Sequence, residues 1–346
     1  MAKDLPLAQT CRGFLPVIAL LVFTQVLPIF AGDQPVDSIA ILAQARKLEE
    51  LRMDPASPFL LDATIQAHFV KGTITGQYAI SWWAANRWRE VLTLADFQRI
   101  RDGVDGGYRQ VRPWDYQPQV IFDIDKVFDV SAILELAPKE TAKKVRKRKI
   151  AGVELSCIEI ASKVRSTRDL CFDPATGVLV HAELSPINTT EGTRFIVDYS
   201  GFIPLGERKF ASKVTLTRPD GFSMEVSISR LEAISGASSP APAVDPHSEF
   251  WQACEVGIPA ELVNQPPPSY PSDSKQKHEQ GIVSVYARVE TDGTLSHLKS
   301  LRSPSASLEQ ATLQAVGRWK YSPRTCEGLP VKEETIIDVT YTLSAY

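Results

Sequence analysis

A long series of alternating segments between residues 60 and 234 constrains the fold of this chain more than any other feature. Within residues 77–83 and 223–231, apolar and polar side chains take turns. A period of two places neighbouring side chains on opposite faces of a β-strand. Turn-forming sequences such as Asp105-Gly106-Gly107 separate the segments. The pattern predicts a large, strongly curved antiparallel sheet over residues 59–235.

Two stretches depart from this alternation and follow the spacing of helices. In residues 38–53, apolar positions such as Leu42 recur among charged ones, and Asp54-Pro55 ends the pattern. This predicts an amphipathic helix within the N-terminal segment 33–58. A second helical segment is expected near residues 120–136, inside the run of strands.

The first 32 residues have the composition of a secretory signal peptide. Lys3 and Arg12 precede an apolar run over residues 14–23, and the small residues Ala31-Gly32 follow it. A membrane-spanning helix needs about 20 apolar residues, which is longer than this run. We therefore expect cleavage after residue 32 and export to the periplasm or cell envelope. The alternative is an uncleaved N-terminus that anchors the protein in the inner membrane.

Export changes the interpretation of the cysteines. Four remain once the signal is removed, and an even number in an oxidising compartment favours disulfides. Cys157 and Cys171 lie in two strand-like runs, and a hairpin between these runs would place them opposite each other. Cys254 and Cys326 would then pair by elimination. Both pairs are expected to be structural, since no C-x-x-C motif is present.

Charge and composition exclude several classes of function. The chain has 38 Lys and Arg against 41 Asp and Glu, and this balance argues against nucleic acid as a partner. No phosphate loop, nucleophile elbow or Ser-His-Asp order occurs, and the five His are isolated. We expect no enzyme activity, no metal and no cofactor. A basic run over residues 143–149 is interpreted as a solvated strand or loop, with anionic lipid contact as the alternative.

A segment rich in Pro, Ser and Ala over residues 236–250 predicts an exposed linker. It is followed by a second domain over residues 251–346, with a strand-strand-helix-strand pattern. The first two strands meet at the turn Asp292-Gly293. The helix carries apolar residues at intervals of three and four from Leu308 to Trp319. The chain as a whole is therefore expected to be α+β.

The spacing of motifs in this second domain is specific. They are Pro268-Ser269-Tyr270-Pro271, Gly281-Ile282-Val283-Ser284-Val285, Asp292-Gly293, Trp319-Lys320-Tyr321-Ser322-Pro323 and Gly328-Leu329-Pro330-Val331. Over residues 265–343 this run resembles the TonB carboxy-terminal domain. The resemblance implies a small periplasmic α/β domain whose last strand accepts an extended peptide of an outer-membrane transporter.

Carried over to this chain, the resemblance implies a docking edge along the last strand. The residues implied are Ile336, Ile337, Asp338, Val339, Thr340 and Tyr341, together with Tyr270 of the Pro-x-Tyr-Pro motif. This motif is usually preceded by Gln, whereas Pro267 stands in that place here. The linker of about 12 residues is also short for a transducer that crosses the periplasm. We therefore expect a general peptide- or protein-binding module of the cell envelope. The alternatives are coupling to an outer-membrane transporter and a stabilising appendage whose last strand is simply a sheet edge.

The first domain has a looser resemblance to LolA-type lipoprotein-carrier domains. It rests on Gly76, Trp82-Trp83, the run Asn86-Arg87-Trp88-Arg89 and Gly106-Gly107-Tyr108. The resemblance implies a half-barrel-like sheet that holds acyl chains on its concave face, and hence a lipid or lipoprotein carrier. The lipid pocket implied would contain Trp82, Trp83, Trp88, Phe97 and Phe122. The alternative is that these aromatics are ordinary core residues, and alternation requires one of Trp82 and Trp83 to leave the core face.

Overall fold

The computed structural model describes residues 37–52, 58–137, 139–162, 167–185, 194–234, 243–254 and 257–343. All of them belong to one compact unit, Val36–Tyr346. The predicted signal peptide (1–32) and residues 236–242 of the predicted linker lie outside the described residues. Within the described part of the chain, no helix combines the length and apolarity needed to cross a membrane.

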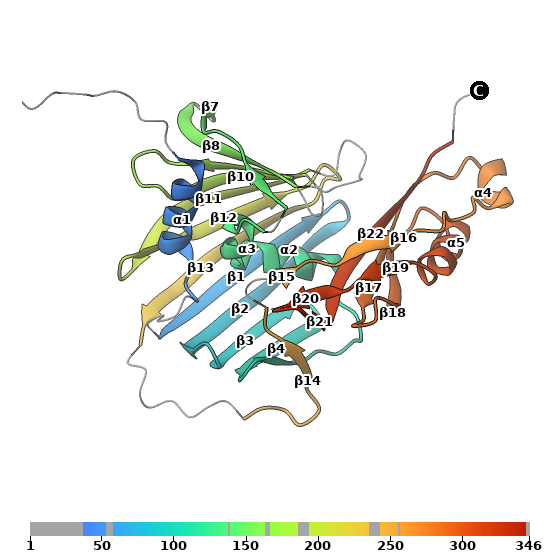
Figure 1. Ribbon diagram of the computed structural model, residues 1–346, viewed down its shortest axis with the longest axis horizontal. Coiled ribbons are helices and arrows are strands. Elements are labelled where there is room, and N and C mark those ends of the chain that lie inside the picture. Colours follow the sequence, from blue (N-terminus) through green and yellow to red (C-terminus); the bar gives the residue numbers. More distant parts are fainter. Residues whose placement is uncertain are drawn as a thin grey trace, which may run out of the picture. The chain divides into compact units, whose positions relative to one another are not determined.

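The first domain is built on one large antiparallel sheet of 14 strands (Figure 1). Its spatial order is β14-β5-β4-β3-β2-β1-β13-β12-β11-β10-β9-β8-β6, and β7 pairs with β8. The strands are β1 (Phe59–Phe69), β2 (Gly72–Ala84), β3 (Arg87–Leu94), β4 (Phe97–Val104), β5 (Gly107–Val111), β6 (Thr141–Ala142), β7 (Arg146–Ile150), β8 (Val153–Ala161), β9 (Thr167–Phe172), β10 (Leu179–Ser185), β11 (Phe195–Leu205), β12 (Arg208–Thr217), β13 (Ser223–Ala233) and β14 (Glu249–Gln252).

The alternation in the sequence produces this sheet. In β1, Phe59, Leu61, Ala63 and Ile65 are buried on one face, while the alternate residues 60, 62 and 64 are more exposed. In β3 the same period buries Trp88 and Leu92. The curved antiparallel sheet predicted from the sequence is therefore confirmed.

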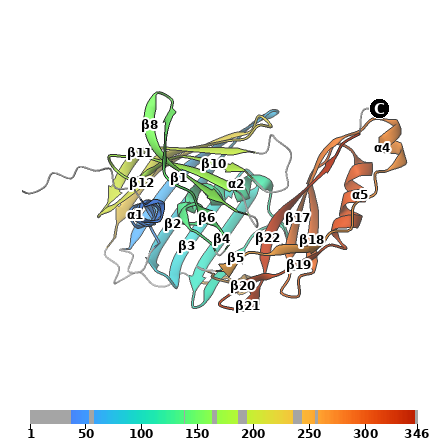
Figure 2. The same ribbon diagram turned by 45° about the horizontal axis from the view of Figure 1, so that its top comes forward.

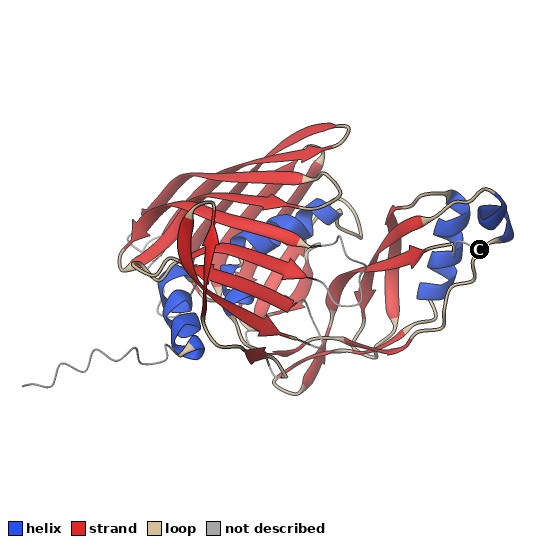
Figure 3. Ribbon diagram, turned by 90° about the horizontal axis from the view of Figure 1, so that it is seen from above, coloured by secondary structure: helices blue, strands red, loops and turns tan. Residues whose placement is uncertain are grey.

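Helices lie along the concave face of the sheet (Figures 2 and 3). They are α1 (Ser38–Glu49), α2 (Gln119–Phe128) and α3 (Val130–Leu134). Asp37 caps α1, since its carboxylate accepts a hydrogen bond from the Ile39 N–H at 2.9 Å. The second helical segment divides at Asp129, where the backbone leaves helical geometry and the side chain caps α3 through the Ala132 N–H.

The chain after residue 256 forms a small α/β arrangement. Its elements are β15 (Gly257–Ile258), β16 (Glu261–Asn264), α4 (Ser272–Gln276), β17 (Gly281–Val289), β18 (Leu295–Arg302), α5 (Ala306–Val316), β19 (Lys320–Ser322), β20 (Arg324–Cys326), β21 (Leu329–Val331) and β22 (Glu333–Tyr341). The main sheet has the order β18-β17-β22. Leu308 and Val316 of α5 share a hydrophobic core with Val283, Val285 and Val339 of this sheet. The predicted strand-strand-helix-strand order is confirmed.

Two disulfides are present, in the pairing expected from the sequence. Cys157 and Cys171 stand opposite each other in the β8–β9 ladder. The second disulfide joins Cys254, two residues after the end of β14, to Cys326 at the end of β20. Because β14 pairs with β5, the chain adds a strand to the large sheet before it enters the small one. The second disulfide therefore links the edge of the large sheet to the C-terminal domain.

Candidate functional site: a free strand edge and a filled concave face

Strand β22 stands at one end of the three-stranded sheet. It pairs with β17 from Gly281 opposite Tyr341 to Val289 opposite Glu333. In an antiparallel pair, alternate residues turn their N–H and C=O groups away from the partner strand. No further strand pairs with the outer side of β22 within the described residues. This side therefore presents a row of main-chain groups that can accept an extended peptide.

The side chains of the predicted docking residues divide between two faces of β22. Ile337, Val339 and Tyr341 are buried in the core beneath α5. Asp338 and Thr340 are exposed on the other face. Of the six predicted docking residues on β22, only Ile336, Asp338 and Thr340 have side chains that an added strand could contact.

Tyr270 lies at the C-terminal end of this edge. Its ring meets the ring of Tyr341 edge-on, with centroids 5.2 Å apart, and its hydroxyl donates a hydrogen bond to the Glu279 carbonyl. The Tyr341 hydroxyl lies 2.9 Å from Thr312 Oγ1 of α5, and burial raises the pKa of Tyr341. The structure thus brings Tyr270 together with the last docking residue and fixes both hydroxyls within the domain.

Much of the second face of the small sheet is also covered. On the face opposite α5, β17 carries Ser284, Tyr286 and Arg288, all buried. The Tyr286 hydroxyl donates to Glu334 at 2.5 Å, and Arg112, which follows β5, pairs with the same carboxylate at 2.6 Å. Residues of the first domain therefore pack against this face, where Asp338 and Thr340 of β22 stay exposed beside the free edge.

A buried ion network occupies the concave face of the large sheet. The fully buried Arg99 of β4 pairs with Glu90 of β3 at 2.9 Å and with Asp125 of α2 at 2.5 Å. Burial alone would raise the pKa of Asp125, but Arg99 and Arg101 outweigh that effect and hold it at about 2. Sequence reasoning missed this network. The available signal was Arg99 itself, which stands in phase with the inward-facing Phe97.

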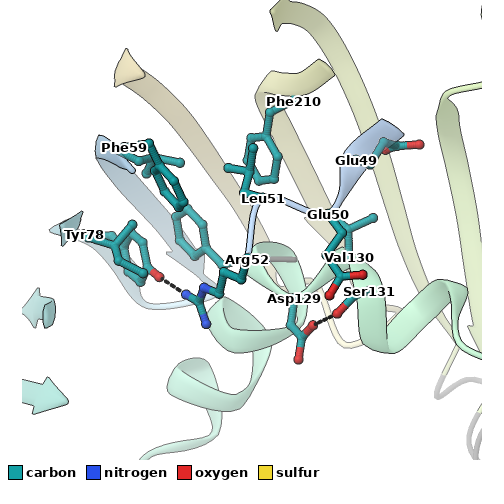
Figure 4. Close-up of a pocket in the computed structure, with 13 residues that line it drawn as sticks. Glu49, Glu50, Leu51, Arg52, Phe59, Tyr78, Asp129, Val130, Ser131 and Phe210 are labelled. Carbon is teal, nitrogen blue, oxygen red and sulfur yellow. Dashed lines mark hydrogen bonds between the residues drawn. The ribbon is translucent and has the colours of Figure 1, made fainter. Parts of the chain in front are cut away.

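A small cavity of about 40 Å³ lies beside this network (Figure 4). Arg52 reaches into it and donates to the Tyr78 hydroxyl at 2.8 Å. At its edge, buried Glu49 accepts a hydrogen bond from the Leu179 N–H at 2.6 Å, and burial raises the pKa of Glu49 to about 8. A cavity of this size holds a few water molecules and is too small for an acyl chain.

The five aromatics proposed for a lipid pocket are not brought together. Trp82, Trp88 and Phe97 are buried in the main core, where the first two stack with centroids 6.0 Å apart. Trp83 follows Trp82 in β2 and so lies on the other face. Phe122 of α2 contacts Tyr286 of the C-terminal domain, with centroids 6.2 Å apart. Their role in lipid binding stays a prediction.

The basic run forms part of β7 and its flanks. Arg146 and Arg148 both pair with Asp169, and Lys147 pairs with Glu154 at 3.0 Å. These side chains lie on an exposed strand of the sheet. The arrangement agrees with the interpretation as a solvated strand whose charges are locally balanced.

Comparison with known proteins identifies the C-terminal segment. Residues 266–343 match the model of the Gram-negative bacterial TonB protein C-terminal family. No curated protein matches the chain. Three solved structures are similar to 57–58% of this chain, and the similarity covers 93% of each of them. They are a domain described as an outer membrane lipoprotein-sorting protein from Vibrio parahaemolyticus (11% identity, TM-score 0.41), a LolA-superfamily protein from Nitrosomonas europaea (10% identity, TM-score 0.38) and a DUF1329-family protein from Desulfovibrio piger (10% identity, TM-score 0.42). The segment recognised by its motifs is thus the segment that matches the TonB C-terminal family.

Proposed function

We propose that this protein is a cell-envelope adaptor whose C-terminal sheet binds an extended peptide of an envelope partner by strand addition to β22. The TonB C-terminal match supports an envelope-associated function. The observation that carries the finer proposal is the unpaired outer side of β22 in the described chain. Helix α5 covers one face of the sheet, and Tyr286 and its partners cover much of the other.

Main-chain hydrogen bonds would supply most of the affinity of such a complex, and side chains would set its register. Asp338 is the exposed charge on β22, and it already accepts a hydrogen bond from Ser284 at 2.6 Å. A basic residue directly opposite Asp338 in the added strand would form a favourable cross-strand pair. The preferred peptide is therefore extended, rich in β-branched residues and basic at one position.

The test uses the full-length protein and a TonB-box peptide of an outer-membrane transporter, with binding measured by calorimetry. Two copies of the peptide carry N-methyl groups, one on the odd amides and one on the even amides. Only amides that face β22 donate to it, so one copy should lose binding and the other should keep it. Absent binding of the unmodified peptide, or equal binding of both methylated copies, would contradict strand addition.

A further inference from the structure

A groove of about 750 Å³ runs beside the ends of strands β1, β12 and β18. The peptide edge on β22 does not use it, and neither does the ion network on the concave face. Its apolar walls come from the β1–β2 turn and the start of β2, from the β12–β13 turn, from the start of α2 and from β18. They include Phe69, Val70, Ile74, Val120, Phe222 and Leu301.

The apolar walls of the groove are accessible to solvent. The Val70 side chain is 83% exposed at the β1–β2 turn, and Phe69 beside it is 36% exposed. The Phe69 ring packs on Phe222, with centroids 5.0 Å apart. Exposed apolar side chains that continue into a concave, aromatic wall are typical of a ligand site.

A β-bulge supplies the wall that faces these turns. In the β17–β18 ladder, Arg302 stands opposite Ser284 and Ser300 stands opposite Val285. Leu301 is therefore the extra residue of a bulge, and a bulge re-aims the side chain that it contains. The half-buried Leu301 lines the groove because of this irregularity.

Cations outnumber carboxylates along the rim of the groove. Lys71, Arg218 and Arg302 line it together with the single carboxylate Asp220. Arg218 is held by Asp123 at 2.6 Å, and Arg302 lies 3.3 Å from Asp220. Lys71 is exposed and makes no ion pair with the other described residues. An anionic group at this rim would meet Lys71 and Arg302 without displacing the buried pair of Arg218.

We propose that this groove binds a lipid with an acyl chain and an anionic head group. The chain lies along the apolar walls, and the head group sits between Lys71 and Arg302. The combination of a long apolar wall with a cationic rim matches this chemistry better than it matches an extended peptide, whose polar backbone would face Val70 and Phe69. The proposal is independent of strand addition at β22.

The test measures the fluorescence of cis-parinaric acid on the full-length protein. We expect saturable binding, and weaker binding of its uncharged methyl ester. Val70→Asp and Arg302→Glu should each lower the affinity about tenfold, because each places a carboxylate against the chain or the head group. The matched controls are Val153→Asp, at an exposed apolar position of β8, and Lys320→Glu, at an exposed cation of β19. Both should leave the affinity unchanged.

Three results would overturn the proposal. One is the absence of saturable binding by the native protein. Another is equal loss of affinity in the groove variants and in their controls. The third is displacement of the probe by the TonB-box peptide in a manner that depends on N-methylation, which would assign the groove to the peptide. Circular dichroism of each variant separates lost binding from lost folding.

Discussion

The large 14-stranded sheet and the small sheet β18-β17-β22 differ in which of their surfaces are covered. The large sheet covers its concave face with α1, α2 and α3 and anchors α2 through the buried Arg99. The small sheet has α5 on one face and residues of the first domain on part of the other, and its β22 edge is unpaired among the described strands. The difference shows that the elements packed beside an antiparallel sheet decide which of its faces and edges remain accessible. In the first sheet that packing buries the concave face, and in the second it leaves one strand edge unpaired among the described residues.

The largest effect should come from breaking the ion network. Arg99→Met removes the fully buried guanidinium between Glu90 and Asp125 and leaves them only the longer contacts with Arg52 and Arg101 at 3.3–3.6 Å. This should lower the free energy of unfolding by about 3–5 kcal/mol. Urea denaturation measures the change. Arg146→Met removes an exposed ion pair of the same sheet and should cost less than about 1 kcal/mol. Equal effects of the two substitutions would contradict a structural role for the network.

The two disulfides should differ in the same assay. The bridge between Cys254 and Cys326 closes 72 residues, and the bridge between Cys157 and Cys171 closes 14. In the chain-entropy model the longer loop contributes roughly 4.4 kcal/mol and the shorter one roughly 3. Replacing each pair by Ser should therefore destabilise the protein more at the longer bridge. The reverse order would show that the link between the sheets contributes little to folding.

Glu49 should make stability depend on pH. Its pKa is raised from 4.5 to about 8, so the folded state holds a proton that the unfolded state releases. Stability is then fully present below about pH 4.5 and falls as the pH rises toward 8, by up to about 1.4 kcal/mol per pH unit. Hydrogen bonding to Asp198 also raises the pKa of His181. The contribution of His181 to stability therefore falls as the pH rises, as for Glu49.

Glu49→Gln isolates the contribution of this carboxyl, because its amide oxygen can still accept from the Leu179 N–H. The difference in unfolding free energy between the native protein and this variant should change between pH 5 and 8. A difference that stays constant over that range would mean that Glu49 titrates normally.

The smallest effect is expected at the edge of the small sheet. Asp338→Lys should weaken a peptide with a basic residue at the opposite position by about two- to fivefold, with little change in stability. Glu309→Lys on α5 makes the same change in charge away from the edge and should leave affinity unaltered. A comparable loss of peptide affinity in both variants would indicate a general effect of net charge rather than a contact at the edge. Added salt would then reduce the loss.

Much of this architecture followed from the sequence. Alternation predicted the large sheet, and the spacing from Pro268 to Val331 identified the C-terminal fold. The pairing of Cys157 with Cys171 followed from the expected hairpin. The parity of Trp82 and Trp83 also showed that one of them had to leave the core face.

The remaining features depend on packing between segments that are distant in sequence. Charged residues in strands are usually exposed, so the position of Arg99 in phase with Phe97 was not enough to predict its burial. The polar residues of β17 alternate with valines, and their burial requires residues such as Arg112 from the first domain. The groove arises because the bulge at Leu301 lies beside turns about 80 and 230 residues earlier. No periodicity in the sequence reports such a juxtaposition.

Hydrogen exchange along β22, measured by mass spectrometry on the full-length protein with and without the TonB-box peptide, tests the central claim most directly. We expect the peptide to slow exchange in segments that contain residues 336–341, since an added strand protects the amides that face it. The paired strand β17 should change little. Protection confined to other segments, or none at saturating peptide, would contradict the assignment of this edge as the binding site.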